Sequence, residues 1–349
     1  MHVSFDPWSP AFVADPYPAY AALRATGRAH YFEPTRQWLI PHYSDVSGLL
    51  RDRRLGRTYL HRFTHEEFGL PAPPDAHEPF HTLNGQGLLD LEAPDHTRIR
   101  RLVSKAFTPR TVEGLAPTVR RLAAELVDAF VAEGGGDLLA AVAEPLPVAV
   151  IAEMLGVPES DLISALIAAH DEGERLSEQE MISTCVLLLN AGHEATVNTT
   201  VNGWRTLFAH PDQLAALRAD HGLLPTAVEE LMRYDTPLQM FERWVLDDIE
   251  IGGTVIPRGS EVALLFGSAN RDPERFAEPD ALDLSRQDNP HVTFGAGIHY
   301  CLGAPLARIE LAASFGELLR KAPTMRVTAE PQWHPGYVIR GLKELRVEL

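Results

Sequence analysis

Apolar residues recur at the spacing of an α-helix over much of the chain. Before residue 160 the pattern predicts three successive helices, over residues 94–106, 110–132 and 139–155. The stretch GGGD at 134–137 separates the second helix from the third, because glycine weakens a helix. Ser177 and Glu180 then form a capping box ahead of the apolar segment 181–210. We expect one long helix there, long enough to cross a domain.

Strand-like patterns are confined to the two ends of the chain. Alternating or β-branched residues occur in AHYFEP and QWLIPH near the beginning, and in MRVTAE and LKELRVEL near the end. Helical patterns dominate between them. The 27 prolines and 25 glycines punctuate these helices, since the sequence shows no internal repeat and no low-complexity tract. The pattern predicts a mainly α fold with small β-sheets.

Composition and charge narrow the class of protein. A chain of 349 residues with 45% hydrophobic content can bury a large core in one or two domains. No stretch approaches the roughly 20 apolar residues of a membrane span, and MHVSFDPWSP lacks the features of a secretion signal. We therefore expect a cytoplasmic protein without a membrane partner. The formal net charge of −17 disfavours nucleic acid as a partner.

Two cysteines cannot build a disulfide framework or a zinc ribbon, so a special cysteine in this chain acts alone. Cys185 lies among apolar residues and is interpreted as packing. Cys301 follows a glycine-rich turn with Gly295 and Gly297, and precedes a helix that begins near Gly303. The helix amides and dipole lower the pKa of a thiol in that place, which suits a metal ligand or a nucleophile.

The residues around Cys301 resemble the haem-binding signature of the cytochrome P450 family. The pattern Phe294-Gly295-x-Gly297-x-His299-x-Cys301-x-Gly303 matches that signature at every fixed position. The resemblance implies haem b as the cofactor and Cys301 as the ligand of its iron. In that family the electron donation of the thiolate favours cleavage of the O–O bond.

Two further stretches carry the same resemblance. EELMRY and the following ANRDPERFAEPDALDLSR resemble the family's Glu-x-x-Arg helix and meander, which implies a structural role for Glu230, Arg233 and Arg286. APDHTRIRRLVSKAF resembles the helix that holds the haem propionates. Since two carboxylates at the edge of a dry pocket need charge-assisted donors, the resemblance implies four of them. They are His96, Arg100, Arg243 and His299.

The stretch AGHEAT on the long helix resembles the family's oxygen-binding segment. Ala191 and Gly192 would leave room over the iron, and Glu194 would supply the acid of a proton relay. Ala195 stands where the family usually places threonine. Thr196 follows one residue later, rotated by about 100° around the helix, and is expected to point elsewhere. Either a water or a substrate hydroxyl replaces the missing alcohol, or the chemistry depends less on controlled O–O cleavage.

The resemblance covers nearly the whole chain and implies one triangular domain over 1–349. Haem would lie between the long helix and the helix that begins at Gly303. Two lid helices of the family have no counterpart near 159–162. Either the gene has lost them, or the sequence omits a segment and joins the ends. We favour the second interpretation, because losing both helices would expose the substrate pocket to water.

The order of segments also predicts a substrate pocket and an electron donor. Six apolar residues are expected to line the pocket, although each could be ordinary core: Leu88, Leu188, Leu189, Leu238, Met240 and Ile339. No flavin or nicotinamide fold fits in the remaining length, so electrons would come from a ferredoxin and a ferredoxin reductase. Four cations could form a basic face for an acidic ferredoxin, or could be ordinary solvated surface charge: Arg100, Arg101, Lys105 and Arg308.

These features together predict a haem-thiolate monooxygenase. It would insert one oxygen atom from O2 into a small organic substrate by hydroxylation or epoxidation, as in the tailoring of natural products. Two alternatives stay open at this point. One is another haem-thiolate oxidation, such as phenol coupling, and the other is a haem-binding protein without monooxygenase turnover.

Overall fold

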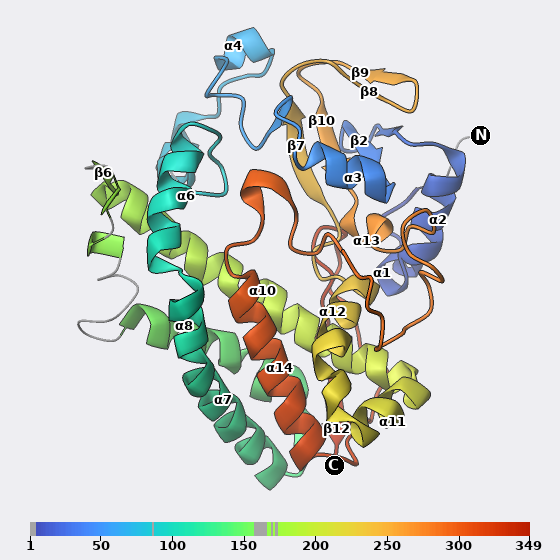
Figure 1. The fold of residues 1–349 in the computed structure, drawn as a ribbon. Helices are drawn as coiled ribbons and strands as arrows, with labels where there is room; N and C mark the ends of the chain where they lie inside the picture. Colours follow the sequence, from blue (N-terminus) through green and yellow to red (C-terminus); the bar gives the residue numbers. More distant parts are fainter. Residues whose placement is uncertain (1–4, 86, 157–165, 169, 172–173) are drawn as a thin grey trace.

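Figure 1 shows the computed structural model of the chain, which describes residues 5–85, 87–156, 166–168, 170–171 and 174–349. Helices dominate, and the longest is α10. The α-helices are α1 (Pro10–Ala14), α2 (Tyr17–Thr26), α3 (Tyr43–Leu49), α4 (His65–Phe68), α5 (Glu78–Asn84), α6 (Asp95–Ala106), α7 (Pro109–Ala132), α8 (Pro145–Gly156), α10 (Glu178–Ala209), α11 (Pro211–Ala219), α12 (Leu224–Tyr234), α13 (Phe266–Ala269) and α14 (Ala304–Lys321).

The predicted helices are largely confirmed. Helices α6 and α7 match 94–106 and 110–132 within one residue, and the capping box of Ser177 and Glu180 begins α10 as expected. The predicted helix over 139–155 is divided. A π-helical turn over Leu139–Ala143 precedes α8, which starts at Pro145 because proline has no N–H to continue the preceding turn. The region near 159–162, where two lid helices were predicted to be missing, lies outside the described residues.

The strands form a five-stranded sheet and three small ones. They are β1 (His30–Phe32), β2 (Gln37–Ile40), β3 (Leu55–Gly56), β4 (Gly135–Asp137), β5 (His170–Asp171), β6 (Glu174–Arg175), β7 (Phe241–Val245), β8 (Ile249–Ile251), β9 (Thr254–Ile256), β10 (Glu261–Leu264), β11 (Arg326–Val327) and β12 (Arg346–Glu348). The largest sheet has the order β1-β2-β10-β7-β3. It lies apart from the long helices in Figure 1.

The prediction that strands occur only at the ends of the chain was wrong. Strands β4 to β10 lie away from both ends of the chain, and β10 is inserted between β2 and β7. The glycine stretch 134–137 was also more than a breaker, because β4 within it pairs with β12. A side chain at Gly135 would lie 2.6 Å from the carbonyl of Val347, so this strand requires glycine.

Helices α10 and α14 are held together by a tightly packed aromatic contact. Trp204 of α10 is fully buried and stacks on Phe315 of α14, with ring centroids 5.3 Å apart. The neighbouring Gly203 allows this approach, because a Cβ there would lie 2.7 Å from the Phe315 ring. Helix α14 also packs along α7 (Figure 1). These contacts hold α14 against α10 and α7, and α14 begins at Ala304, shortly after Cys301.

A buried ion network joins α12 to the segment that leads to Cys301. Glu230 and Arg233 are both inaccessible to solvent, and the guanidinium donates two hydrogen bonds to the carboxylate, at 2.7 and 2.8 Å. Arg233 also donates to the carbonyls of Asn270 and Pro279. Arg286 donates to Glu230 at 3.1 Å, as the sequence predicted for this trio. The network ties three separate segments to one carboxylate.

We predict that Glu230→Gln lowers the free energy of unfolding by about 3–5 kcal/mol, because it leaves two buried guanidiniums without their counter-charge. Urea denaturation of the purified protein measures the change. Glu125→Gln is the matched control, since Glu125 forms an exposed ion pair with Arg121 and should change stability little. Equal effects of the two substitutions would contradict this account.

Candidate functional site

The loop before Cys301 has a backbone that only glycine adopts readily. Gly295 and Gly297 have φ values of +68° and +70°. A Cβ at Gly297 would lie 2.3 Å from the carbonyl oxygen of Leu50, so this turn also contacts the N-terminal part of the chain. The N–H of Cys301 donates to the carbonyl of Phe294 at 3.0 Å, which closes the loop. Backbone geometry therefore fixes the position of the cysteine.

The environment of the Cys301 sulfur contains opposing electrostatic effects. Burial raises the pKa of the Cys301 thiol, whereas hydrogen bonds from the N–H groups of Gly303 and Ala304 and the positive charges of Arg100 and Arg308 lower it. The net shift is upward, so the expected lowering by the helix terminus is present but outweighed by burial. Arg100 also donates to the carbonyl of Tyr300 at 2.8 Å. Four groups thus favour a thiolate at this place.

Arg308 is held by a carboxylate that sequence analysis did not single out. Glu229 accepts two hydrogen bonds from Arg308, at 2.6 and 2.8 Å, and also contacts His291 at 3.1 Å. Burial opposes ionisation, yet these partners lower the pKa of Glu229 to about 2. The Arg308 guanidinium lies 4.5 Å from the ring centre of Phe294. Because Glu229 directly precedes Glu230, α12 supports the cysteine loop through both residues.

His96 is a buried side chain without a hydrogen-bond partner. It is 1% exposed, and neither ring nitrogen has a partner. Burial and the nearby charges of His299 and Arg100 lower the pKa of His96 to about 4. Its ring centre lies 4.4 Å from that of His299, as the predicted shared role requires. Because buried polar atoms are normally hydrogen-bonded, the His96 ring is expected to bind a polar group of a ligand.

Arg243 is joined by a second arginine, Arg57, which sequence analysis missed. Gly56 pairs with Trp244 across β3 and β7, so Arg57 and Arg243 occupy the next paired positions. Both guanidiniums donate to the carbonyl of Glu242, at 3.0 and 2.8 Å. Both lie near the ring of Phe241, at 4.4 and 4.8 Å from its centre. Burial and the charge of Arg57 lower the pKa of Arg243 to about 9.

Glu92 is the buried carboxylate that contacts this group. It accepts from the backbone N–H of Arg57 at 2.7 Å and contacts Nε2 of His299 at 3.1 Å. Burial opposes ionisation, but these hydrogen bonds and the charge of Arg243 lower the pKa of Glu92. Cationic and neutral donors outnumber carboxylates here. The arrangement is typical of a site that binds an anion with two or more acidic groups.

The predicted oxygen-binding segment lies on α10. Glu194 and Ala195 are exposed, and Ala191 is exposed as well. A Cβ on Gly192 would lie 2.8 Å from the end of the Ile151 side chain of α8, and the predicted room over the iron stays a prediction. Gly192 therefore allows close packing of α8 on α10.

Thr196 points away from Ala195, as the rotation around the helix predicted. It is 7% exposed, and its hydroxyl hydrogen-bonds with Glu310 of α14. Glu310 is 2% exposed, and burial raises the pKa of its carboxyl to about 8 although Thr196 opposes the shift. Glu310 is thus a protonated acid at neutral pH, adjacent to the helix segment around Ala195. No short motif in the sequence marked this residue.

A pocket of about 420 Å³ lies beside the same segment of α10. Its lining includes Glu194 and Asn198 of α10, Trp8 near the N-terminus, and Ile339 in the C-terminal part. Ile339 forms a β-bridge with Leu238, so two predicted pocket residues are brought together. The others are placed differently. Leu88 and Met240 are buried in hydrophobic clusters and Leu188 packs against one, whereas Leu189 is 49% exposed.

Comparison with known proteins agrees with this geometry. Residues 153–322 match the family model for cytochrome P450. The chain is 38% identical over 391 aligned positions to cytochrome P450 monooxygenase PikC of Streptomyces venezuelae, covering 96% of this chain and 91% of that protein. The chain belongs to the cytochrome P450 family, and it is a monooxygenase.

Two further proteins show the same similarity. The polyketide biosynthesis cytochrome P450 PksS of Bacillus subtilis is 33% identical, with 99% of this chain and 98% of that protein covered. The structure of the tirandamycin C-bound P450 monooxygenase TamI superposes with a TM-score of 0.87 at 38% identity, covering 99% of both chains. In the described part of this chain, no helix has the length and apolar character needed to cross a membrane.

Membership of this family implies a haem-thiolate cofactor, and the described residues fit one. The unpartnered nitrogens of His96 and the buried guanidiniums of Arg57 and Arg243 match the two carboxylates of a haem. Cys301 lies with four groups that stabilise a thiolate. The structure brings four of the predicted residues, His96, Arg100, Arg243 and His299, into one group. Arg57, Glu92 and Glu229 are added by the structure.

We predict that Arg57→Ala accelerates haem loss about tenfold, because it removes one buried charge-assisted donor. The rate of haem transfer to apomyoglobin measures this loss. Arg54→Ala is the matched control, since Arg54 pairs with Asp52 on the exposed surface and should not change the rate. Unchanged haem retention in Arg57→Ala would show that Arg57 serves only the β3–β7 contact.

Proposed function

We propose that this monooxygenase inserts one oxygen atom into a small natural product, by hydroxylation or epoxidation. The observation that carries the proposal is the buried group of unpartnered and cationic side chains beside the Cys301 loop. Several relatives bear names from natural-product biosynthesis, including the polyketide P450 PksS and a 6-deoxyerythronolide B hydroxylase. The predicted cytoplasmic location stays a prediction.

The roles of the site residues follow from their surroundings. Haem b supplies the activation of dioxygen when it is bound, with Cys301 as the proposed iron ligand. His96, Arg100, Arg243 and His299 are the predicted propionate donors, and Arg57 joins them. Glu92 contacts and orients His299, and its negative charge offsets part of the positive charge of this group. Phe294 and Arg308 pack against the cysteine loop and hold it in place.

Protons are proposed to arrive through two groups on α10 and α14. Glu194 lines the pocket and can exchange protons with its surroundings. Glu310 holds a proton at neutral pH and hydrogen-bonds with the hydroxyl of Thr196, the residue that follows Ala195 on α10. Ala195 itself has no hydroxyl. A substrate hydroxyl or a water therefore completes the route, as the sequence predicted, and Glu310 adds a buried source.

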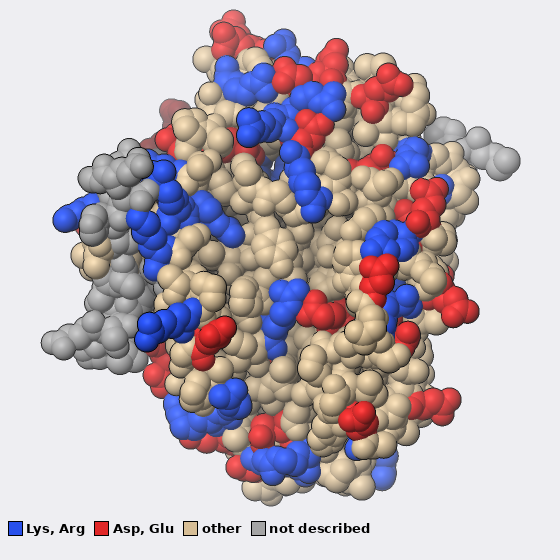
Figure 2. Space-filling model, viewed as in Figure 1, with Lys and Arg blue, Asp and Glu red and all other residues tan. Residues whose placement is uncertain are grey.

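The electron donor is proposed to be a ferredoxin, reduced by a ferredoxin reductase. Bacterial members of this family use separate redox partners. Lys and Arg side chains gather where α6 lies in Figure 2, which fits the predicted docking of an acidic protein. Arg308 contributes less than expected, because Glu229 neutralises it, and Arg100 is engaged with Tyr300. Arg101 and Lys105 of α6 are both exposed and stay the proposed contacts on this face.

We predict that Cys301→Ser abolishes the long-wavelength Soret band that the reduced CO complex of a haem-thiolate protein shows, because serine cannot supply a thiolate. Absorption spectra of the two reduced proteins under CO measure this change. Cys185→Ser is the matched control, since Cys185 is half-buried and packs against a hydrophobic cluster. A normal thiolate spectrum in Cys301→Ser would refute the assignment. A normal thiolate spectrum in the parent protein, with no product from any substrate tested, would indicate a haem protein without turnover.

We predict two effects of Glu310→Gln. Product formed per NADPH should fall several-fold and peroxide should rise, because a proton source is lost. The folded carboxyl keeps its proton up to about pH 8, whereas an unfolded one loses it above about pH 4.5. The folded state thus binds more protons in this window, so this residue makes stability fall as pH rises, and the substitution removes that fall.

Product, peroxide and the urea midpoint are measured from pH 5 to pH 8 for the parent and the variant. Glu317→Gln on the same helix is the control, because Glu317 forms ion pairs near the surface. A change in the stability profile with unaltered product yield would show that Glu310 is structural and has no part in proton delivery.

A further inference from the structure

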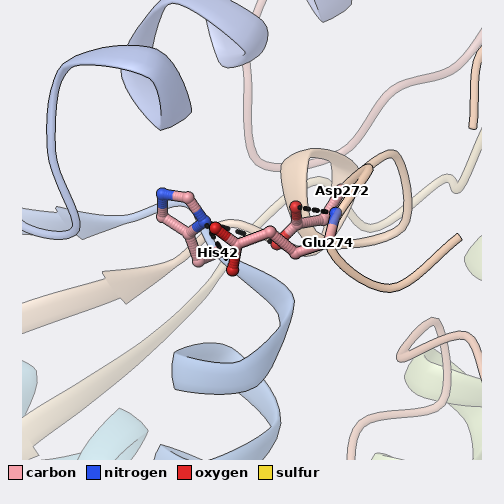
Figure 3. A group of neighbouring side chains, drawn as sticks. All are labelled: His42, Asp272 and Glu274. Atoms are coloured by element: carbon pink, nitrogen blue, oxygen red, sulfur yellow. Dashed lines mark hydrogen bonds and ion pairs between the residues drawn. The ribbon is translucent and has the colours of Figure 1, made fainter.

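A histidine and two carboxylates lie together just beyond the end of strand β2. His42 follows β2, whereas Asp272 and Glu274 belong to the loop after α13 (Figure 3). Nδ1 of His42 is 3.4 Å from Asp272 and 3.8 Å from Glu274. The three ligand atoms lie within 4.8 Å of one another. They come from segments that are about 230 residues apart in the chain.

Nδ1 of His42 faces the two carboxylates. Nε2 of the same ring lies 3.1 Å from the carbonyl of Arg24 and donates to that oxygen. Nδ1 makes no hydrogen bond, although the side chain is only 8% exposed. An imidazole nitrogen and two carboxylates that face one point are ligand types that a divalent transition-metal ion takes.

Neighbouring arginines do not fill this place. Arg28 reaches Glu274 only at 3.6 Å, because its Nε is held by Asp45 at 2.8 Å. Arg24 donates to the carbonyl and hydroxyl of Ser268. Asp272 is fixed by the backbone N–H groups of Tyr43 and Glu274, at 2.7 and 3.0 Å. The carboxylate is therefore held in position independently of any bound ion.

We propose that His42, Asp272 and Glu274 bind a divalent transition-metal ion, of which zinc is the best match. Zinc takes imidazole nitrogen and carboxylate oxygen at about 2.0–2.2 Å, and tetrahedral geometry then places two ligand atoms about 3.4 Å apart. The N–H of a ligating histidine usually donates to a backbone carbonyl, as His42 does here. The Glu274 side chain is 59% exposed, which leaves the fourth position open to water.

A metal in this place would fasten the end of β2 to the segment that follows α13. That segment continues into the residues that Arg233 and Arg286 hold, and then into the cysteine loop. The ion would therefore stabilise the fold near the site without contacting the substrate pocket. Calcium and magnesium are poorer matches, because they prefer oxygen ligands throughout.

The test uses the haem-loaded enzyme after removal of metals with EDTA. Isothermal titration with zinc chloride should show one zinc per chain, and zinc should raise the melting temperature. Glu274→Gln should weaken zinc binding at least tenfold and remove the rise in melting temperature. Glu278→Gln is the matched control, since it removes the same charge from an exposed residue of the same loop. His42→Gln should abolish binding.

Three results would overturn the proposal. One is the absence of zinc binding at millimolar concentration, which would leave the trio as a cluster of contacts within the protein. Another is equal affinity in Glu274→Gln and Glu278→Gln, which would place the zinc elsewhere. The third is unchanged binding in His42→Gln. Because Glu274 is exposed, its variant should fold, and the test stands even if His42→Gln does not.

Discussion

The buried contact between Glu230 and Arg233 is the constraint on which the site depends. Moving either charge out of water is costly, and the cost is offset only when every polar atom finds a partner. Arg233 meets this condition with Glu230 and with carbonyls of the segment that leads to the cysteine. That segment cannot shift without exposing one of these groups to an apolar surrounding. The position of Cys301 therefore depends on this buried ion pair, which lies outside the substrate pocket.

The buried basic groups around the site are a second constraint. Each is costly to bury alone, and a negatively charged partner offsets that cost. Burial holds the pKa of His96 near 4 and that of Arg243 near 9, so both are less basic than they would be in water. Burying such basic groups against one another is unfavourable unless a negatively charged group binds between them. The propionates of a haem provide it. Folding around the cofactor and binding of the cofactor are thus linked in energy.

The sequence predicted the elements that obey a single local rule. Helices α6, α7 and α10 have clear periodicity, α7 and α10 also begin at side-chain caps, and the cysteine loop carries a contiguous signature. Other residues were missed because they meet only in three dimensions. Arg57 reaches Arg243 through the pairing of β3 with β7, and Glu310 reaches Thr196 across two helices. The contact of Gly192 with α8 was also missed, since a pattern of small residues does not say which helix approaches it.

The insertion of β10 between β2 and β7 has a consequence for how the chain assembles. Gln37 pairs with Glu261, two positions separated by 224 residues, so the largest sheet cannot close until most of the chain has left the ribosome. Contacts between distant residues form slowly, because a long loop must be ordered before they contribute. Until β10 has been made, β2 therefore has an unpaired edge that is exposed to solvent. During synthesis this edge is a point at which a chaperone would protect the chain from pairing with another copy.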